Sequence, residues 1–141
     1  MTINEGNATA PTRGRNWFLA AAALGLAGTV IHIWAGGPEI MDPLYASSLP
    51  IASVAVLDVV WQQVTALLLG GGLVAALAAF RPAWRRPVAW LLGGHYLVVS
   101  AIFLVWGAMW FSSPWPMPQW ILFAGMAGLM FSGLRFTSRG P

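Results

Sequence analysis

The stretch from Ile51 to Phe80 contains no Lys, Arg or Glu, and Asp58 is its only acidic residue. A helix of roughly 20 apolar residues crosses a bilayer core about 30 Å thick, so this stretch is long enough to span one. A chain of 141 residues has too small a core to cover such a helix on all sides in water. The stretch therefore predicts an integral membrane protein.

Composition supports the same class and excludes several others. Charged residues make up 8% of the chain, against about 25% in soluble domains. Every basic residue is an Arg, and these Arg are spread over separate polar segments, which excludes the contiguous basic face of a nucleic-acid-binding protein. The absence of Cys excludes disulfides, thiolate metal sites and iron–sulfur clusters.

Hydropathy along the chain predicts an all-α fold, an antiparallel bundle of four transmembrane helices. The expected helices cover residues 17–35, 51–80, 88–110 and 119–136, within a membrane domain of residues 17–136. We expect a disordered tail over residues 1–16 and a short tail over residues 137–141. A signal peptide is the alternative for the first apolar run, but that run exceeds the 7–15 residues usual for a signal core.

The connections between these helices differ in charge and in length. Asp42 followed by Pro43 predicts a short helical turn, a lid on the membrane surface, within residues 36–50. The link Arg81–Pro87 is short and basic. With four spans, all of the Arg residues fall on one side: Arg13, Arg15, Arg81, Arg85, Arg86, Arg135 and Arg139. The positive-inside rule then places both termini in the cytoplasm. The membrane that we expect the protein to span is the cell inner (plasma) membrane.

Small residues recur at helical spacing on three of the expected helices, where they allow the close backbone approach that membrane helices need. They form the sets Ala21, Gly25 and Gly28; Gly93, Ser100 and Gly107; Gly94, Ala101 and Ala108; and Ala124, Gly128 and Ser132. These faces indicate tight packing within the chain, against a second copy or against another membrane protein.

A few polar residues inside the apolar segments are the candidates for function, because ionisable groups in a membrane are costly and face the protein interior. We expect His32, Asp58, Gln62 and Thr65 to form an outward-facing pocket that Glu39 and the lid close. A His–carboxylate pair there would bind a cation or small polar ligand, or relay a proton. The alternative is a structural hydrogen bond between His32 and Asp58 that fixes helix register.

Two His in a helical chain raise the question of haem or a chlorophyll-type pigment. His32 and His95 are expected about 22 Å and about 8 Å from the inner interface, too far apart in depth to share one iron. A single-His cofactor site remains a hypothesis for either residue, with Gly93 and Gly94 leaving room beside His95. No metal-ligand pair at helical spacing and no nucleophile motif occurs, so the metal is unknown and no catalytic residue is assigned.

Three hypotheses for function follow. The one we favour is a small, non-catalytic accessory or assembly subunit, surrounded by the lipid bilayer and bound to a membrane-protein partner or to itself, without a cofactor. The second is a small carrier or ligand-binding protein that uses His32, Asp58 and Gln62. The third is a redox subunit that carries haem, a pigment or a metal.

Overall fold

The computed structural model describes residues 10–137, and every regular element within that range is a helix. The expected tails at residues 1–9 and 138–141, with Arg139, lie outside the described residues. The elements in chain order are α1 (Ala10–Trp34), the π-helical turn η2 (Gly37–Met41), α2 (Asp42–Tyr45), α3 (Ile51–Phe80), α4 (Pro82–Val88), the π-helical turn η3 (Ala89–Gly93), α5 (Gly94–Phe111) and α6 (Gln119–Thr137).

Within residues 10–137, three helical segments are long and apolar enough to cross a membrane: Gly14–Trp34, Ile51–Phe80 and Pro82–Phe111. The prediction of an all-helical chain with membrane-spanning helices is confirmed at this level. Helix α6, with 19 residues, is not among the three. Only 33%, 33% and 28% of the most apolar windows of these segments are buried within the chain. Most of their surface is therefore left to lipid or to a partner.

Helix α1 begins at Ala10 and not at Trp17, so residues 10–16 of the expected disordered tail are helical. The polar composition of these residues suggested disorder, but a helix that is already nucleated adds one hydrogen bond for each further residue. Pro11 is tolerated there because it lies in the first turn. Gly14 is buried, which adds packing to this extension.

The link between the second and third spans is also shorter than expected. Only Arg81 leaves the helical conformation, with φ −124° and ψ 87°, and α4 begins at Pro82. Proline suits this first position because its fixed φ matches a helix and its missing N–H needs no partner there. Pro87 lies inside α4 and is followed by the wide turn η3 before α5 continues the same long segment. Proline has no N–H group, so one backbone hydrogen bond of the helix is missing at Pro87. The wider π-helical turn η3 accommodates this loss before the α-helix resumes.

Arg85, a basic residue of the link between the second and third expected helices, is only 3% exposed. Its Nε donates to the carbonyl oxygen of Ala78 at 3.2 Å, and its Nη2 donates to that of Ala79 at 2.7 Å. The last turn of a helix leaves carbonyl groups without intrahelical partners. Arg85 satisfies these carbonyls at the end of α3, so it caps the helix across the break at Arg81.

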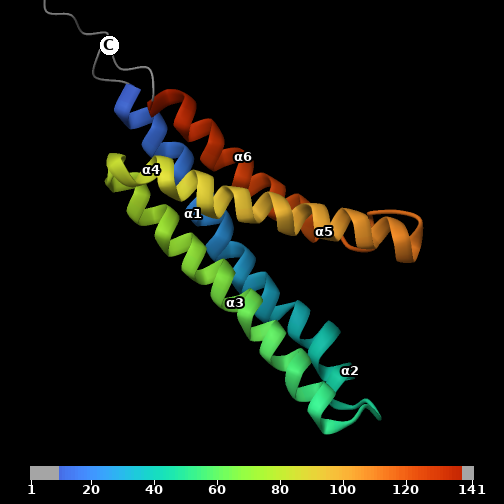
Figure 1. Ribbon diagram of the computed structural model, residues 1–141. Helices are drawn as coiled ribbons and strands as arrows, with labels where there is room; N and C mark the ends of the chain where they lie inside the picture. Colours follow the sequence, from blue (N-terminus) through green and yellow to red (C-terminus); the bar gives the residue numbers. More distant parts are fainter. Residues whose placement is uncertain (1–9, 138–141) are drawn as a thin grey trace, which may run out of the picture.

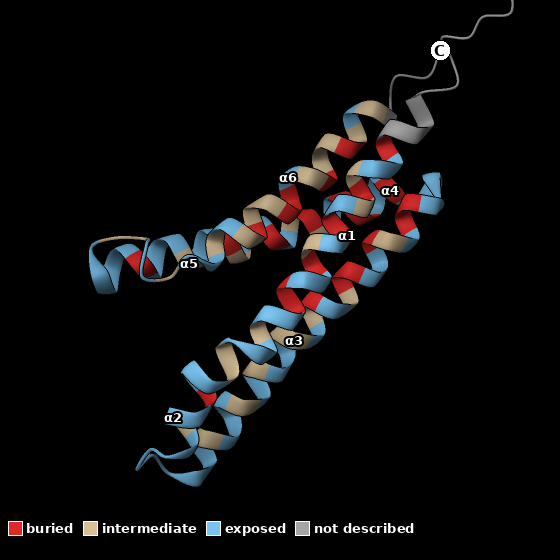
Figure 2. Ribbon diagram, turned by 180° about the vertical axis from the view of Figure 1, so that it is seen from behind, coloured by how far each residue is buried: buried red, intermediate tan, exposed pale blue. Residues whose placement is uncertain are grey.

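The helices meet at the end of the molecule that carries this break and then diverge. Helix α1 packs against α3 on one side and α6 on the other, and α5 packs against α6 (Figure 1). Helices α3 and α5 separate as they leave α4. Buried residues are concentrated where the four helices meet, and the outer parts of α3 and α5 are largely exposed (Figure 2). The four helices thus share one core at one end and do not form a single bundle along their whole length.

Small residues supply the closest contacts in this core. A Cβ atom added to Gly25 of α1 would lie 3.2 Å from the Cα atom of Gly72 in α3, so the two backbones touch. The set Gly93, Ser100 and Gly107 is buried, and the Ser100 hydroxyl donates to the carbonyl oxygen of Trp120 in α6 at 3.0 Å. In the other set on this segment, Gly94, Ala101 and Ala108, both alanines are exposed. One small face of α5 therefore packs inside the chain, while the other points outward.

Tyr96 and Gly71 provide a test of how α5 meets α3. The Tyr96 hydroxyl donates to the carbonyl oxygen of Leu67 at 3.3 Å, and a methyl group on Gly71 would collide with that hydroxyl. We expect Gly71→Ala to lower the free energy of unfolding by about 1–3 kcal/mol, the usual cost of overpacking. Thermal unfolding in detergent, followed by circular dichroism, measures this change.

The neighbouring Gly70 is the matched control, because a Cβ atom there would meet nothing within 4 Å. Gly70→Ala raises helix propensity without a clash, so the thermal unfolding midpoint of this variant is expected to stay the same or to rise. Equal midpoints for the two variants would mean that Tyr96 does not fill the space beside Gly71.

Candidate functional site

His32, near the end of α1, lies against Trp61 of α3. The two rings stack with centroids 3.7 Å apart and planes 21° apart. The Nε2 atom of His32 is 3.3 Å from the carbonyl oxygen of Trp61. Because a carbonyl only accepts, Nε2 carries the hydrogen in this contact, and Nδ1 of the neutral ring is left as an acceptor. His32 is thus held by an aromatic ring and a backbone group.

Trp61 is the residue at this site that the sequence analysis missed. A Cβ atom on Gly36 would lie 2.8 Å from the Trp61 ring, so this glycine makes room for the indole. The Thr65 hydroxyl donates to the Trp61 carbonyl oxygen at 3.2 Å, so the candidate Thr65 shares an acceptor with His32. The available signal was a Trp well inside an apolar helix, away from the interface positions that Trp favours.

Asp58 lies about one turn before Trp61 on α3 and has different partners. Its Oδ1 atom accepts a hydrogen bond from the Gln62 side-chain amide at 3.3 Å. The phenol of Tyr45, on α2, also hydrogen-bonds to Asp58, and this bond raises the pKa of Tyr45 above its usual value. Tyr45 is therefore one contact between the short helix expected as a lid and α3.

The expected pocket is only partly assembled. Among residues 10–137, no hydrogen bond or ion pair joins His32 to Asp58, or Glu39 to either of them. Glu39 lies on η2 with its side chain exposed. Gln62 is exposed as well, because α3 packs on α1 through Trp61, Leu68 and Gly72 and not through the Asp58–Gln62 side. A ligand-binding or proton-relay role for these residues stays a prediction.

His95 lies at the start of α5 with its side chain exposed, away from the His32 site. The space beside Gly93 is occupied, since a Cβ atom there would lie 3.2 Å from the Phe131 ring. A Cβ atom at Gly94 would meet nothing within 4 Å. The space beside Gly94 is thus open and the space beside Gly93 is filled, and the cofactor hypothesis for His95 stays a prediction.

Two polar groups lie on either side of Trp61: the His32 ring, for whose Nδ1 atom no hydrogen bond is found among residues 10–137, and the Asp58 carboxyl group, which accepts from Gln62. Within the part of the chain that the structure describes, no three His, Cys, Asp or Glu side chains converge as metal ligands do. No protein-family model, curated protein or solved structure matches this chain. The function is therefore argued from this geometry and from the surfaces that the helices expose.

The Tyr45–Asp58 hydrogen bond can be tested by titration. The chain has 2 Tyr, so Tyr96→Phe leaves Tyr45 as the only phenol, and its ionisation is followed by phenolate absorbance. In that background Asp58→Ala is expected to lower the pKa of Tyr45 towards its ordinary value of about 10, because the bond and the nearby charge are both lost. The contact itself is present below the raised pKa and is lost as pH rises through it.

Asp42→Ala is the matched control, since Asp42 acts on Tyr45 only through its charge and is the smallest of the causes. Its effect on the Tyr45 titration is expected to be smaller than that of Asp58→Ala. An equal or larger effect would show that Tyr45 does not hydrogen-bond to Asp58.

Proposed function

We propose that this chain is a small, non-catalytic protein of the cell inner membrane that serves as an accessory or assembly subunit. It would associate through α3 with a larger membrane complex or with a second copy of itself. The single observation that carries this proposal is the position of Gln62 and Gln63, two exposed amides near the middle of α3.

The depth of these amides is the first step of the argument. At a rise of 1.5 Å per residue, Gln63 lies about 18 Å from the start of α3 and about 26 Å from its end. Within residues 10–137, Gln62 bonds only to Asp58 and no hydrogen bond is found for Gln63. Polar groups left unsatisfied in hydrocarbon cost several kcal/mol, so polar side chains within spans normally face protein. A partner helix with donors and acceptors at this depth would satisfy both amides.

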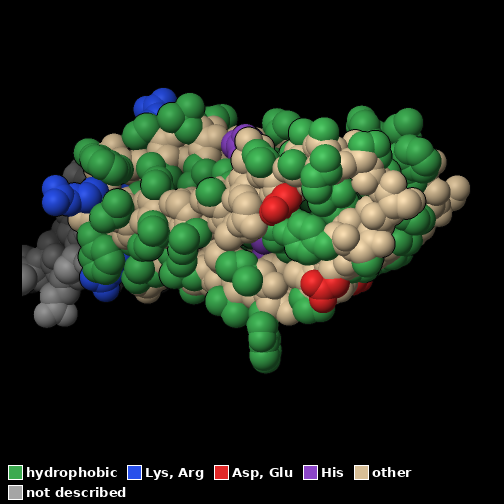
Figure 3. Space-filling view, turned by 90° about the horizontal axis from the view of Figure 1, so that it is seen from below, with side chains coloured by type: hydrophobic (Ala, Val, Ile, Leu, Met, Phe, Trp, Pro, Cys, Tyr) green, Lys and Arg blue, Asp and Glu red, His purple; other side chains and the backbone are tan. Residues whose placement is uncertain are grey.

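The proposed topology has four spans, with both termini in the cytoplasm. Helix α6, at 19 residues, is about 28 Å long and comes close to the thickness of a bilayer core. The Arg side chains gather at one end of the face in Figure 3, and the acidic side chains lie away from that end. This asymmetry supports the orientation that the positive-inside rule favours.

The carrier hypothesis ranks second because Asp58 is engaged by Tyr45 and Gln62 within the chain. A residue that is already hydrogen-bonded on two sides fits a structural role at least as well as a ligand site. The observation that still supports this hypothesis is the Nδ1 atom of His32, for which no hydrogen bond is found within the described residues.

Cysteine cross-linking in native membranes tests the subunit proposal, since the chain has no Cys of its own. Val59 is exposed one turn before Gln63, so Val59→Cys places a thiol on the proposed face without removing either amide. Val98→Cys, on the exposed surface of α5, is the matched control. We expect Val59→Cys alone to give a cross-linked product, with a membrane protein or with a second copy.

Gln62→Leu and Gln63→Leu, added to Val59→Cys, are expected to weaken this association. An interhelical hydrogen bond in a membrane is worth about 0.6 kcal/mol, so each change should lower affinity roughly three-fold. The product is measured on gels and its partner is identified by mass spectrometry. Equal cross-linking at Val59→Cys and Val98→Cys, or no response to the Gln changes, would count against the proposal.

A further inference from the structure

Gln63 lies on the side of α3 that faces away from α1. Helix α3 meets α1 at Leu68 and Gly72, which lie beside Gly25. Successive residues of a helix differ by about 100° in direction, so Gln63 and Gly70 both point roughly 140–160° away from Leu68. The Gln63 side chain is exposed there.

Other residues continue this side of α3 at alternating spacings of four and three residues. The whole set, which we call the α3 seam, is Val59, Gln63, Ala66, Gly70, Leu73 and Leu77. Val59, Leu73 and Leu77 are 57%, 52% and 54% exposed. Alternation of four and three residues is the heptad spacing at which membrane helices pack with a left-handed crossing of about 20°. The seam therefore has the spacing of a helix–helix interface, with one polar residue in it.

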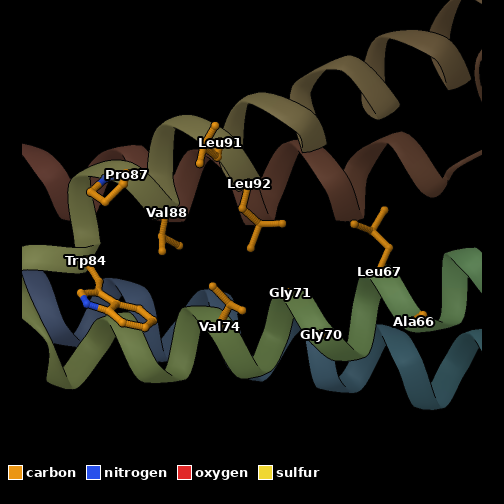
Figure 4. A pocket seen from close by; sticks show the side chains of 10 residues that line it. All are labelled: Ala66, Leu67, Gly70, Gly71, Val74, Trp84, Pro87, Val88, Leu91 and Leu92. Atoms are coloured by element: carbon orange, nitrogen blue, oxygen red, sulfur yellow. The ribbon is translucent and has the colours of Figure 1, made fainter.

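The seam runs beside an apolar groove of about 510 Å³ that lies between α3 and the α4–η3 segment (Figure 4). Ala66 and Gly70 line this groove as well as the seam, whereas Leu73 and Leu77 belong to the seam alone. A Cβ atom at Gly70 would meet nothing within 4 Å, so the described part of the chain leaves the seam open here. Small side chains at these two positions allow the backbone of a second helix to come close.

The chemistry of Gln63 indicates which helix fits the seam. No hydrogen bond is found for its amide within residues 10–137. A carboxylate only accepts and an ammonium only donates, but an amide does both and can therefore pair with a copy of itself. Two copies of the chain carry the same Arg pattern and insert in the same orientation, which brings both Gln63 side chains to one depth. A second copy thus supplies the donor and the acceptor that Gln63 needs.

We propose that the partner of α3 is a second copy of this chain, in a parallel dimer with a two-fold axis along the membrane normal. The two α3 seams pack against each other, and the two Gln63 amides exchange hydrogen bonds across the axis. Helix α1 packs on the opposite side of each α3, so it stays outside the interface. This inference rests on the proposed function and names the partner that it requires.

Disulfide formation by the purified full chain in phosphatidylcholine vesicles tests the dimer, because no other protein is present there. The chain has no Cys, so each variant carries a single thiol. Identical positions meet across a two-fold axis, so we expect Val59→Cys and Leu73→Cys each to form a covalent dimer. Leu69→Cys is the matched control and is expected to form none. Leu69 is 44% exposed on the same helix but lies about 100° from Gly70.

Substitution of Gln63 tests the amide pair. Gln63→Leu is expected to raise the dissociation constant of the dimer about eight-fold, the value of two interhelical hydrogen bonds. Gln63→Asn still donates and accepts, so this variant is expected to keep the dimer. Energy transfer is measured between copies labelled at Ser47→Cys, in the exposed loop before α3, as lipid is added. Circular dichroism checks that both variants remain helical.

The dimer is contradicted if Leu69→Cys forms as much covalent dimer as the two seam variants, or if Gln63→Leu leaves the dissociation constant unchanged. It is also contradicted if the chain stays monomeric in vesicles while Val59→Cys cross-links to a different protein in native membranes. That last result leaves the subunit proposal standing. A chain that gives no product in either setting contradicts both proposals.

Discussion

The structure depends on how the chain turns between two long apolar helices in an environment without water. Backbone carbonyls at the end of α3 need partners, and the guanidinium of Arg85 supplies them by bonding to Ala78 and Ala79. Because one side chain caps the helix, the break is confined to Arg81. The two long segments therefore leave the same point, and their crossing there creates both the shared core and the groove.

The chain satisfies its polar groups unevenly as a result. Near the junction, Tyr96 and Ser100 hydrogen-bond to backbone carbonyls of neighbouring helices. In the outer part of α3, Asp58 is held by Gln62 and by Tyr45. Gln63 lies between these regions, one turn beyond Ala66, at which α3 and α5 have already separated (Figure 4). No hydrogen bond is found for it within the described residues. The divergence of the helices thus accounts for an amide that the chain alone does not satisfy.

The helical class was predictable because apolar length and the needs of the backbone in a bilayer allow few other structures. The partners of His32 were not predictable in the same way. Polarity favoured Asp58 as the partner of His32. Neighbouring positions on a helix differ by about 100° in direction, however, so the way a helix packs decides which of its residues face the next helix. The close packing of Gly72 on Gly25 turns Trp61 towards α1. The burial of Arg85 was not predictable, because it requires the break at Arg81 and nothing in the local sequence separates Arg85 from Arg86.

The face of α3 that points towards α5 changes its chemistry along its length. Ala66, Gly70 and Val74 line the groove near the junction, and Gln63 lies one turn further on at the same helical spacing. The first part of this face needs only apolar contact, which offers nothing to an amide. Gln63 needs a partner with a hydrogen-bond donor and acceptor. The two parts of this face therefore call for different contacts, with the boundary between Ala66 and Gln63.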